Sequence, residues 1–186
     1  MPTTIAGART AAGLRFGIIR SRFNEAVTKR LLDGALEALH KGGAHDESIG
    51  VVVVPGAFEI PVVAARLARS HRYDALICLG AVIRGETPHF EYISAALSRG
   101  IARVAYDYGL PVIFGVLTTN TDKQAEARSG IGGVCNRGYE AGVAAIEMAN
   151  LMKKLGSRPE VTPPPIPPPS RGRARERGRT ARKRPR

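Results

Sequence analysis

Four short apolar runs alternate along the chain with longer stretches that have a helical period. The runs lie at residues 14–19, 49–54, 75–83 and 112–117, and they are typical of parallel strands that are buried on both faces. The stretches at 25–41, 61–70, 91–108 and 139–155 carry apolar side chains in helical spacing. This order predicts an α/β protein with three layers, α/β/α, around a four-stranded parallel sheet with right-handed crossovers.

The last 30 residues have a different composition from the rest of the chain. They contain ten Lys and Arg against two Asp and Glu, and eight of the 13 prolines. They therefore contribute +8 of the net charge of +12. They also offer almost no apolar surface whose burial could offset the entropy lost on ordering. We predict an N-terminal arm at 1–13, one domain at 14–156 and a disordered basic tail at 157–186 that begins as a polyproline II spacer.

Cysteine content and hydropathy exclude several classes of protein. The two cysteines, Cys78 and Cys135, are not arranged as a disulfide framework or a zinc ribbon. No apolar run approaches the roughly 18 residues of a membrane span, and the first residues lack the design of a signal peptide. We expect a soluble, cytoplasmic protein without membrane partners.

The segments that follow the strands carry the polar and aromatic residues expected of a site. These segments are 21–24, 55–61, 84–90 and 118–121, and ligands of parallel sheets bind beyond the carboxyl ends of the strands. Although the predicted fold is flavodoxin-like, the first of these segments is not rich in Ser, Thr and Gly as a flavin phosphate loop would be. Walker-type and dinucleotide-binding glycine motifs are also missing from the sequence.

Five side chains in or near these segments are candidates for binding or chemistry. His89 lies among polar neighbours, which favours proton transfer over a turn histidine satisfied by the main chain. Phe23 and Phe58 are either stacking platforms for a flat ring or packing at the sheet edge. Arg128 and Arg137 lie at helix ends and fit either a phosphate site or solvated charge.

Five segments of the chain together carry a family resemblance. They are residues 21–24, 55–61, 80–92, 111–119 and 136–141. In this order and at these separations they resemble the motifs of 6,7-dimethyl-8-ribityllumazine synthases, over about residues 14–155. The resemblance implies a transferase of riboflavin biosynthesis. It would condense 5-amino-6-(D-ribitylamino)uracil with 3,4-dihydroxy-2-butanone 4-phosphate to 6,7-dimethyl-8-ribityllumazine, phosphate and water, the penultimate step of that pathway.

The resemblance also assigns roles to residues, and it implies no metal and no organic cofactor. His89 would be the catalytic proton donor and acceptor. The residues implied to bind the pyrimidine are Phe23, Ala57, Phe58, Glu59, Ala81, Val82, Ile83 and Phe114, with Phe114 contributed by the neighbouring subunit. The residues implied to bind the butanone phosphate are Gly85, Glu86, Thr87, Arg128 and Arg137.

The assembly implied by the resemblance is a homopentamer with active sites between subunits, which in some members forms a 60-subunit capsid. Riboflavin synthase is a further partner that it suggests. One stretch departs from the family motif RAGxKAGNKG: residues 128–138 are one residue longer and have a glycine in place of the first lysine, while Arg137 keeps the second basic position.

Two other functions compete with the synthase. One is a catalytically weak protein that binds lumazine or riboflavin, favoured by the missing lysine. The other is a scaffold that binds nucleic acid through the basic tail, with salt-dependent affinity. A tail that serves only solubility is an equal alternative for the last 30 residues.

Overall fold

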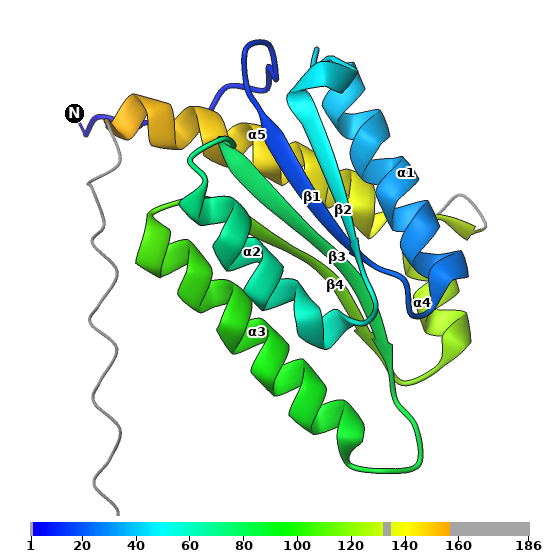
Figure 1. The fold of residues 1–186 in the computed structure, drawn as a ribbon. Coiled ribbons are helices and arrows are strands. Elements are labelled where there is room, and N and C mark those ends of the chain that lie inside the picture. Colours follow the sequence, from blue (N-terminus) through cyan, green and yellow to red (C-terminus); the bar gives the residue numbers. More distant parts are fainter. Residues whose placement is uncertain (1, 132–134, 157–186) are drawn as a thin grey trace, which may run out of the picture.

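The computed structural model describes residues 2–131 and 135–156, and these contain the predicted parallel sheet. Its strands are β1 (Phe16–Ser21), β2 (Ile49–Val54), β3 (Ala75–Ile83) and β4 (Val112–Thr119), in the spatial order β2-β1-β3-β4 (Figure 1). All neighbouring pairs are parallel. The predicted α/β fold with a four-stranded sheet is therefore confirmed. The tail predicted at 157–186 lies outside the described residues.

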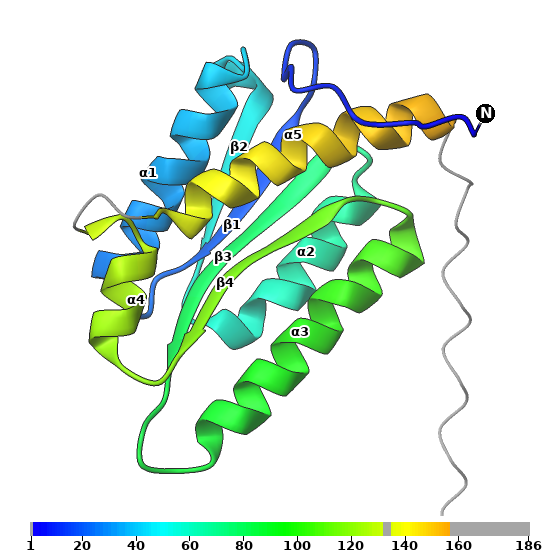
Figure 2. The ribbon, with the colours of Figure 1, turned by 180° about the vertical axis from the view of Figure 1, so that it is seen from behind.

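Helices cover both faces of the sheet, which confirms the three predicted layers. On one face lie α2 (Ile60–Arg69) and α3 (His89–Tyr108), and on the other lie α1 (Glu25–Lys41), α4 (Asp122–Arg128) and α5 (Arg137–Leu155) (Figures 1 and 2). Two short 3₁₀ turns, Asp46–Ser48 and Ala57–Glu59, precede β2 and α2. No helix in the described part of the chain is long and apolar enough to cross a membrane.

The central strand β3 explains why the sequence contains continuous apolar runs. Leu76 and Cys78 pack toward α2 and α3, whereas Ile77 and Leu79 pack toward α1 and α5, and all four are fully buried. A strand with a helical layer on each side needs apolar side chains at every position. Burial also raises the pKa of the Cys78 thiol well above its ordinary value, so Cys78 stays protonated as a core side chain.

The prediction that all four strands are buried on both faces is wrong for the edge strands β4, whose Phe114 is 42% exposed, and β2. This strand forms one edge of the sheet, and its Val51 and Val53 are 42% and 50% exposed. They pair in register with Ile18 and Arg20 of β1 and share the face of α1 and α5. An apolar run by itself does not distinguish a central strand from an edge strand.

Helices α1 and α5 approach each other closely along a seam of small residues. A Cβ atom added to Gly138 would overlap the main chain of Leu31, and one added to Gly142 would lie 2.7 Å from the Cβ of Ala38. Glycine at these positions therefore lets the two backbones come into contact.

Two polar side chains of α5 are hydrogen-bonded to the chain's own N-terminal arm. The Asn150 side chain donates hydrogen bonds to the carbonyls of Ala8 (3.2 Å) and Thr10 (2.8 Å), and Lys154 donates to the carbonyl of Ala6 (2.7 Å). The arm lies along α5 in Figure 2. The arm therefore covers part of one face of α5.

Candidate active site

A cavity of about 670 Å³ lies at the edge of the sheet where the strands end. The register pairs Ser21 with Val54 and Ile83 with Thr119, so the carboxyl ends of all four strands lie at this edge. Among the residues predicted from the sequence, the cavity is lined by Phe23, Ala57, Phe58, Glu59, Ala81, Val82, Ile83, Gly85, Thr87 and His89. Segments far apart in the sequence therefore meet at one place, as expected for a parallel sheet.

Phe23 projects from the turn between β1 and α1. The ladder between β1 and β2 continues into this turn, with the Phe23 amide donating to the Pro55 carbonyl at 3.0 Å. Asn24 adopts a left-handed conformation (φ 56°), and its side chain donates to the Ala81 carbonyl of β3 at 2.9 Å. Phe23 is fixed at its main chain but 70% exposed at its ring. This exposure favours the stacking alternative over packing at the sheet edge.

The turn before α2 is stabilised by its own carboxylate. Glu59 accepts a hydrogen bond from the Gly56 amide at 2.8 Å, which holds the start of the turn Ala57–Glu59. Ala57 is buried beneath this turn, whereas Phe58 is 58% exposed at the cavity. One oxygen of Glu59 is thus engaged in holding the turn.

Arg84 fastens both sides of the loop between β3 and α3. Its Nε donates to the Asn120 side chain at 2.9 Å, and its guanidinium lies over the Phe90 ring at 4.3 Å and pairs with Glu91. The hydrogen bond from Arg84 lowers the pKa of the Glu91 carboxyl below its ordinary value. The loop that carries Gly85 and Thr87 is therefore held between two anchored ends.

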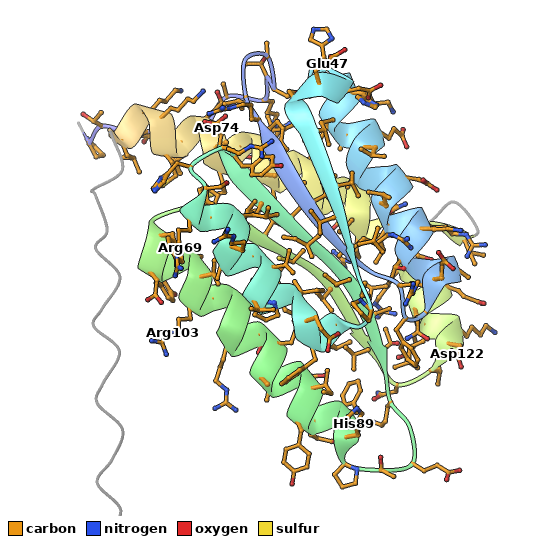
Figure 3. All side chains as sticks on the ribbon, viewed as in Figure 1. Glu47, Arg69, Asp74, His89, Arg103 and Asp122 are labelled. Atoms are coloured by element: carbon orange, nitrogen blue, oxygen red, sulfur yellow. The ribbon has the colours of Figure 1, made fainter. Side chains whose placement is uncertain are left out.

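His89 is the first residue of α3, at the sheet edge where β3 ends (Figure 3). Helix α3 begins two residues earlier than the sequence predicted, and Pro88 occupies its N-cap position. The imidazole is exposed and makes no hydrogen bond to any other described residue. It is thus available to a ligand in the cavity that it lines.

Three lining residues were missed by the sequence prediction: Gly56, Phe90 and Ile93. Phe90 follows His89 directly, and Ile93 lies one helical turn after it on the same face of α3. The predicted helix at 91–108 contains Ile93, so the sequence places this residue on the correct helix without linking it to the site. Glu86, in contrast, was predicted to bind and is exposed without lining the cavity.

The remaining predicted residues lie elsewhere. Phe114, Arg128 and Arg137 line a second cavity of about 390 Å³, between β4, the end of α4 and the first half of α5, and it shares no lining residue with the first cavity. Phe114 is 42% exposed there. The structure of one chain therefore separates the predicted site into two parts.

Glu140, which lines the second cavity, interacts with two of its neighbours in the sequence. It pairs with Arg137 and accepts a hydrogen bond from the Cys135 thiol at 2.9 Å. These contacts lower the pKa of the Glu140 carboxyl, and the same hydrogen bond, together with burial, raises the pKa of Cys135. Arg128 donates one hydrogen bond to the Gln124 carbonyl at 3.1 Å. Within residues 2–131 and 135–156 we find no cluster of His, Cys, Asp and Glu that could hold a metal ion.

Comparisons with known proteins match nearly the whole described domain. Residues 13–153 match the family model described as 6,7-dimethyl-8-ribityllumazine synthase. Two relatives that carry this name are each 54% identical over 155 residues, or 83% of this chain. The relative from Desulfatibacillum aliphaticivorans is matched over 99% of its length, and the one from Syntrophus aciditrophicus (strain SB) over 100%.

Proposed function

The chain belongs to the 6,7-dimethyl-8-ribityllumazine synthase family, and we propose that the cavity at the carboxyl ends of its strands is one half of the active site. The protein is a transferase of riboflavin biosynthesis. It condenses 5-amino-6-(D-ribitylamino)uracil with 3,4-dihydroxy-2-butanone 4-phosphate to 6,7-dimethyl-8-ribityllumazine, phosphate and water. The observation that carries the assignment of the site is that one cavity is lined by two exposed phenylalanines and by a histidine that has no hydrogen-bond partner among the described residues.

The flat pyrimidine fits the apolar part of this cavity. We propose that the exposed ring of Phe23 stacks on it and that the main chain of Ala81–Ile83 lies along its edge, with Phe58 and Glu59 holding the ribityl chain. The anchored turns described above hold these groups before substrate binds. Little ordering entropy is then lost on binding.

The butanone phosphate fits the loop that ends at His89. We propose that Gly85 and Thr87 contact this substrate within the cavity, and Glu86 through its main chain at the rim. The 5-amino group adds to the ketone and forms an imine with loss of water, phosphate leaves by elimination, and the ribitylamino nitrogen closes the ring with loss of a second water. Each step moves protons between nitrogen, carbon and oxygen, and we assign these transfers to His89.

Most of the rate acceleration then comes from holding two substrates together. A bimolecular step that becomes effectively unimolecular gains roughly 7–11 kcal/mol at best. The protein groups that bind the two substrates are therefore expected to contribute at least as much to the rate as the side chain that transfers protons.

The second cavity supplies the phosphate-binding half. We propose that Phe114, Arg128 and Arg137 of one subunit close the first cavity of its neighbour in a homopentamer, with the two guanidinium groups on the phosphate. The exposed apolar side chains Val51 and Val53 support burial against another subunit. A 60-subunit capsid, an association with riboflavin synthase, nucleic-acid binding by the tail and a cytoplasmic location stay predictions.

The test of the proposed site is the absorbance of the lumazine product when both substrates are added to the purified protein. We expect His89→Ala to lower kcat by about 10²-fold, the lower end of the usual contribution of a general acid–base group. His45→Ala, at an exposed histidine before β2, is the matched control and should leave the rate unchanged. An unchanged kcat in His89→Ala would contradict the assignment of proton transfer to His89. Product at the uncatalysed rate with the pyrimidine still bound would favour a binding protein.

A further inference from the structure

We propose that Asn136 is a positioning residue that fixes Arg128 and Arg137 relative to each other and to α1. The inference rests on the proposed function, in which these two arginines bind the phosphate of the butanone substrate. Asn136 itself does not line the second cavity, either with its side chain or with its main chain. Asn136 therefore acts through its neighbours.

The side-chain amide of Asn136 uses both of its ends. Its Oδ1 accepts hydrogen bonds from the amides of Gly138 (2.8 Å) and, more weakly, Tyr139 (3.4 Å), which caps the start of α5. Its Nδ2 donates to the Arg30 carbonyl of α1 at 2.9 Å. The first residue of α5 is Arg137. The position of its main chain is thus tied to α1 through a single amide group.

The main chain of Asn136 makes the second connection. It forms an isolated antiparallel bridge with Ser129, a residue that is 1% exposed. Ser129 follows Arg128 directly, and Asn136 precedes Arg137, so the bridge joins the two neighbours of the arginines. Ser129 is itself fixed to the end of α4, because its amide and its hydroxyl donate to the Glu126 carbonyl at 3.0 and 2.9 Å.

Two glycines provide the space that Asn136 occupies. A Cβ on Gly34, in the middle of α1, would lie 2.5 Å from the Asn136 amide, and one on Gly130 would lie 3.2 Å from its Nδ2. Glycine inside a helix is about 1 kcal/mol less favourable than alanine. Here it makes room for a hydrogen bond between residues that are 106 positions apart.

This arrangement explains how the chain tolerates its departure from the family motif between the arginines. The stretch from Arg128 to Arg137 is one residue longer than the motif and lacks its first lysine. The bridge closes the base of this stretch, so the separation of the arginines does not depend on its length. With one cation fewer, bidentate contacts from both guanidinium groups become more important, and such contacts need a fixed geometry.

The test is Asn136→Ser, measured with each substrate varied in turn. Serine keeps a side-chain oxygen for the helix cap but removes the donor to Arg30 and adds no charge. We expect the KM for the butanone phosphate and the inhibition constant of inorganic phosphate both to rise about three- to tenfold, the worth of one hydrogen bond. The KM for the pyrimidine should stay within about twofold, since the first cavity shares no lining residue with the second.

The matched control is Asn150→Ser, on the same helix. Asn150 also donates hydrogen bonds from its side chain, to the carbonyls of Ala8, Thr10 and Ile146. It lies at the other end of α5, so it should lower thermal stability without moving either KM. Equal effects of the two substitutions on the KM values would overturn the proposal.

A second variant reaches Asn136 without altering it. Gly34→Ala favours the helical state of α1 but places a methyl group against the Asn136 amide, so it should raise the KM for the butanone phosphate in the same direction. If Asn136→Ser does not fold, Gly34→Ala provides the test, and an unchanged KM for the butanone phosphate in that variant refutes the proposal. Arg128→Ala distinguishes a failure of the proposed phosphate site from a failure of the positioning role of Asn136. A normal KM in Arg128→Ala refutes the phosphate site itself, whereas a raised KM there with normal values in the Asn136 and Gly34 variants refutes the positioning role alone.

Discussion

Arg84 shows how single contacts prepare the proposed site. Its guanidinium reaches Asn120 after β4 and Phe90 and Glu91 at the start of α3, so it joins two segments on either side of the loop before His89. None of these contacts needs substrate. The loop is therefore held in place in the free protein.

The ion pair between Arg84 and Glu91 should make stability depend on pH. Arg84 lowers the pKa of Glu91 in the folded state, so the pair stabilises the fold above the unfolded-state value of about 4.3 and loses this effect as pH falls through the lower folded-state pKa. We expect Glu91→Gln to lower the urea midpoint at pH 7, with a difference from the unmodified protein that shrinks below about pH 4. Both side chains are exposed, so the effect is small.

The control for this substitution is Glu47→Gln, since Glu47 makes no ion pair with another described residue and is far from the site in Figure 3. Its small effect should be the same at both pH values. If Glu91→Gln shows a difference that does not change with pH, the ion pair does not contribute to folding.

At the scale of elements, the contact between α1 and α5 determines where the second cavity forms. The first half of α5 packs against α1, with Gly138 against Leu31 and Gly142 against Ala38, and the start of α5 lies beside α1 in Figure 2. Because β4 and α5 both line that cavity, a change in the helix packing displaces Arg137 as well.

Gly138→Ala tests this close approach. Its added methyl group would overlap the main chain of Leu31, and main chain cannot move aside as a flexible side chain can. We expect a loss of about 1–3 kcal/mol in the free energy of unfolding, the usual range for overpacking, measured by urea denaturation. Gly85→Ala, where a built Cβ has nothing within 4 Å, should change stability by less than about 0.5 kcal/mol. Equal stabilities of the two variants would contradict the close contact between α1 and α5 at Gly138.

At the scale of the whole molecule, the described part of one chain has two separate cavities, each with part of the proposed site. The first cavity has the aromatic and imidazole groups, and the second has the arginines. In a ring of identical subunits, each interface places one surface of a subunit against a different surface of the next. Each interface could then contain one complete site.

Mixing two defective variants tests the arrangement. His89→Ala and Arg128→Ala should each be weakly active as pure proteins. After unfolding and refolding together in equal amounts, about one quarter of the interfaces should combine an intact His89 with an intact Arg128 from the next subunit, if assembly is random. We expect product formation to recover to roughly that fraction of the unmodified rate. A mixture no more active than the average of the two variants would contradict shared sites.

The sequence by itself determined the order of the elements, the layers and most side chains at the first cavity. The apolar runs and helical periods are local patterns, and in a parallel sheet they place the segments after each strand at one edge. The residue types in these segments singled out Phe23, Phe58 and His89, to which the resemblance assigned roles, and the structure brings the three into one cavity.

Only the tertiary structure decided which strands lie at the edges of the sheet, which segment binds the polar side chains of α5, and which groups hold the site residues. Val51 looks as buried in the sequence as Leu76 does, and nothing near Asn136 indicates that its partner is the carbonyl of Arg30. The reason is physical. Periodicity records how a residue relates to its neighbours along the chain, whereas a hydrogen bond between segments more than a hundred residues apart depends on where folding places both of them.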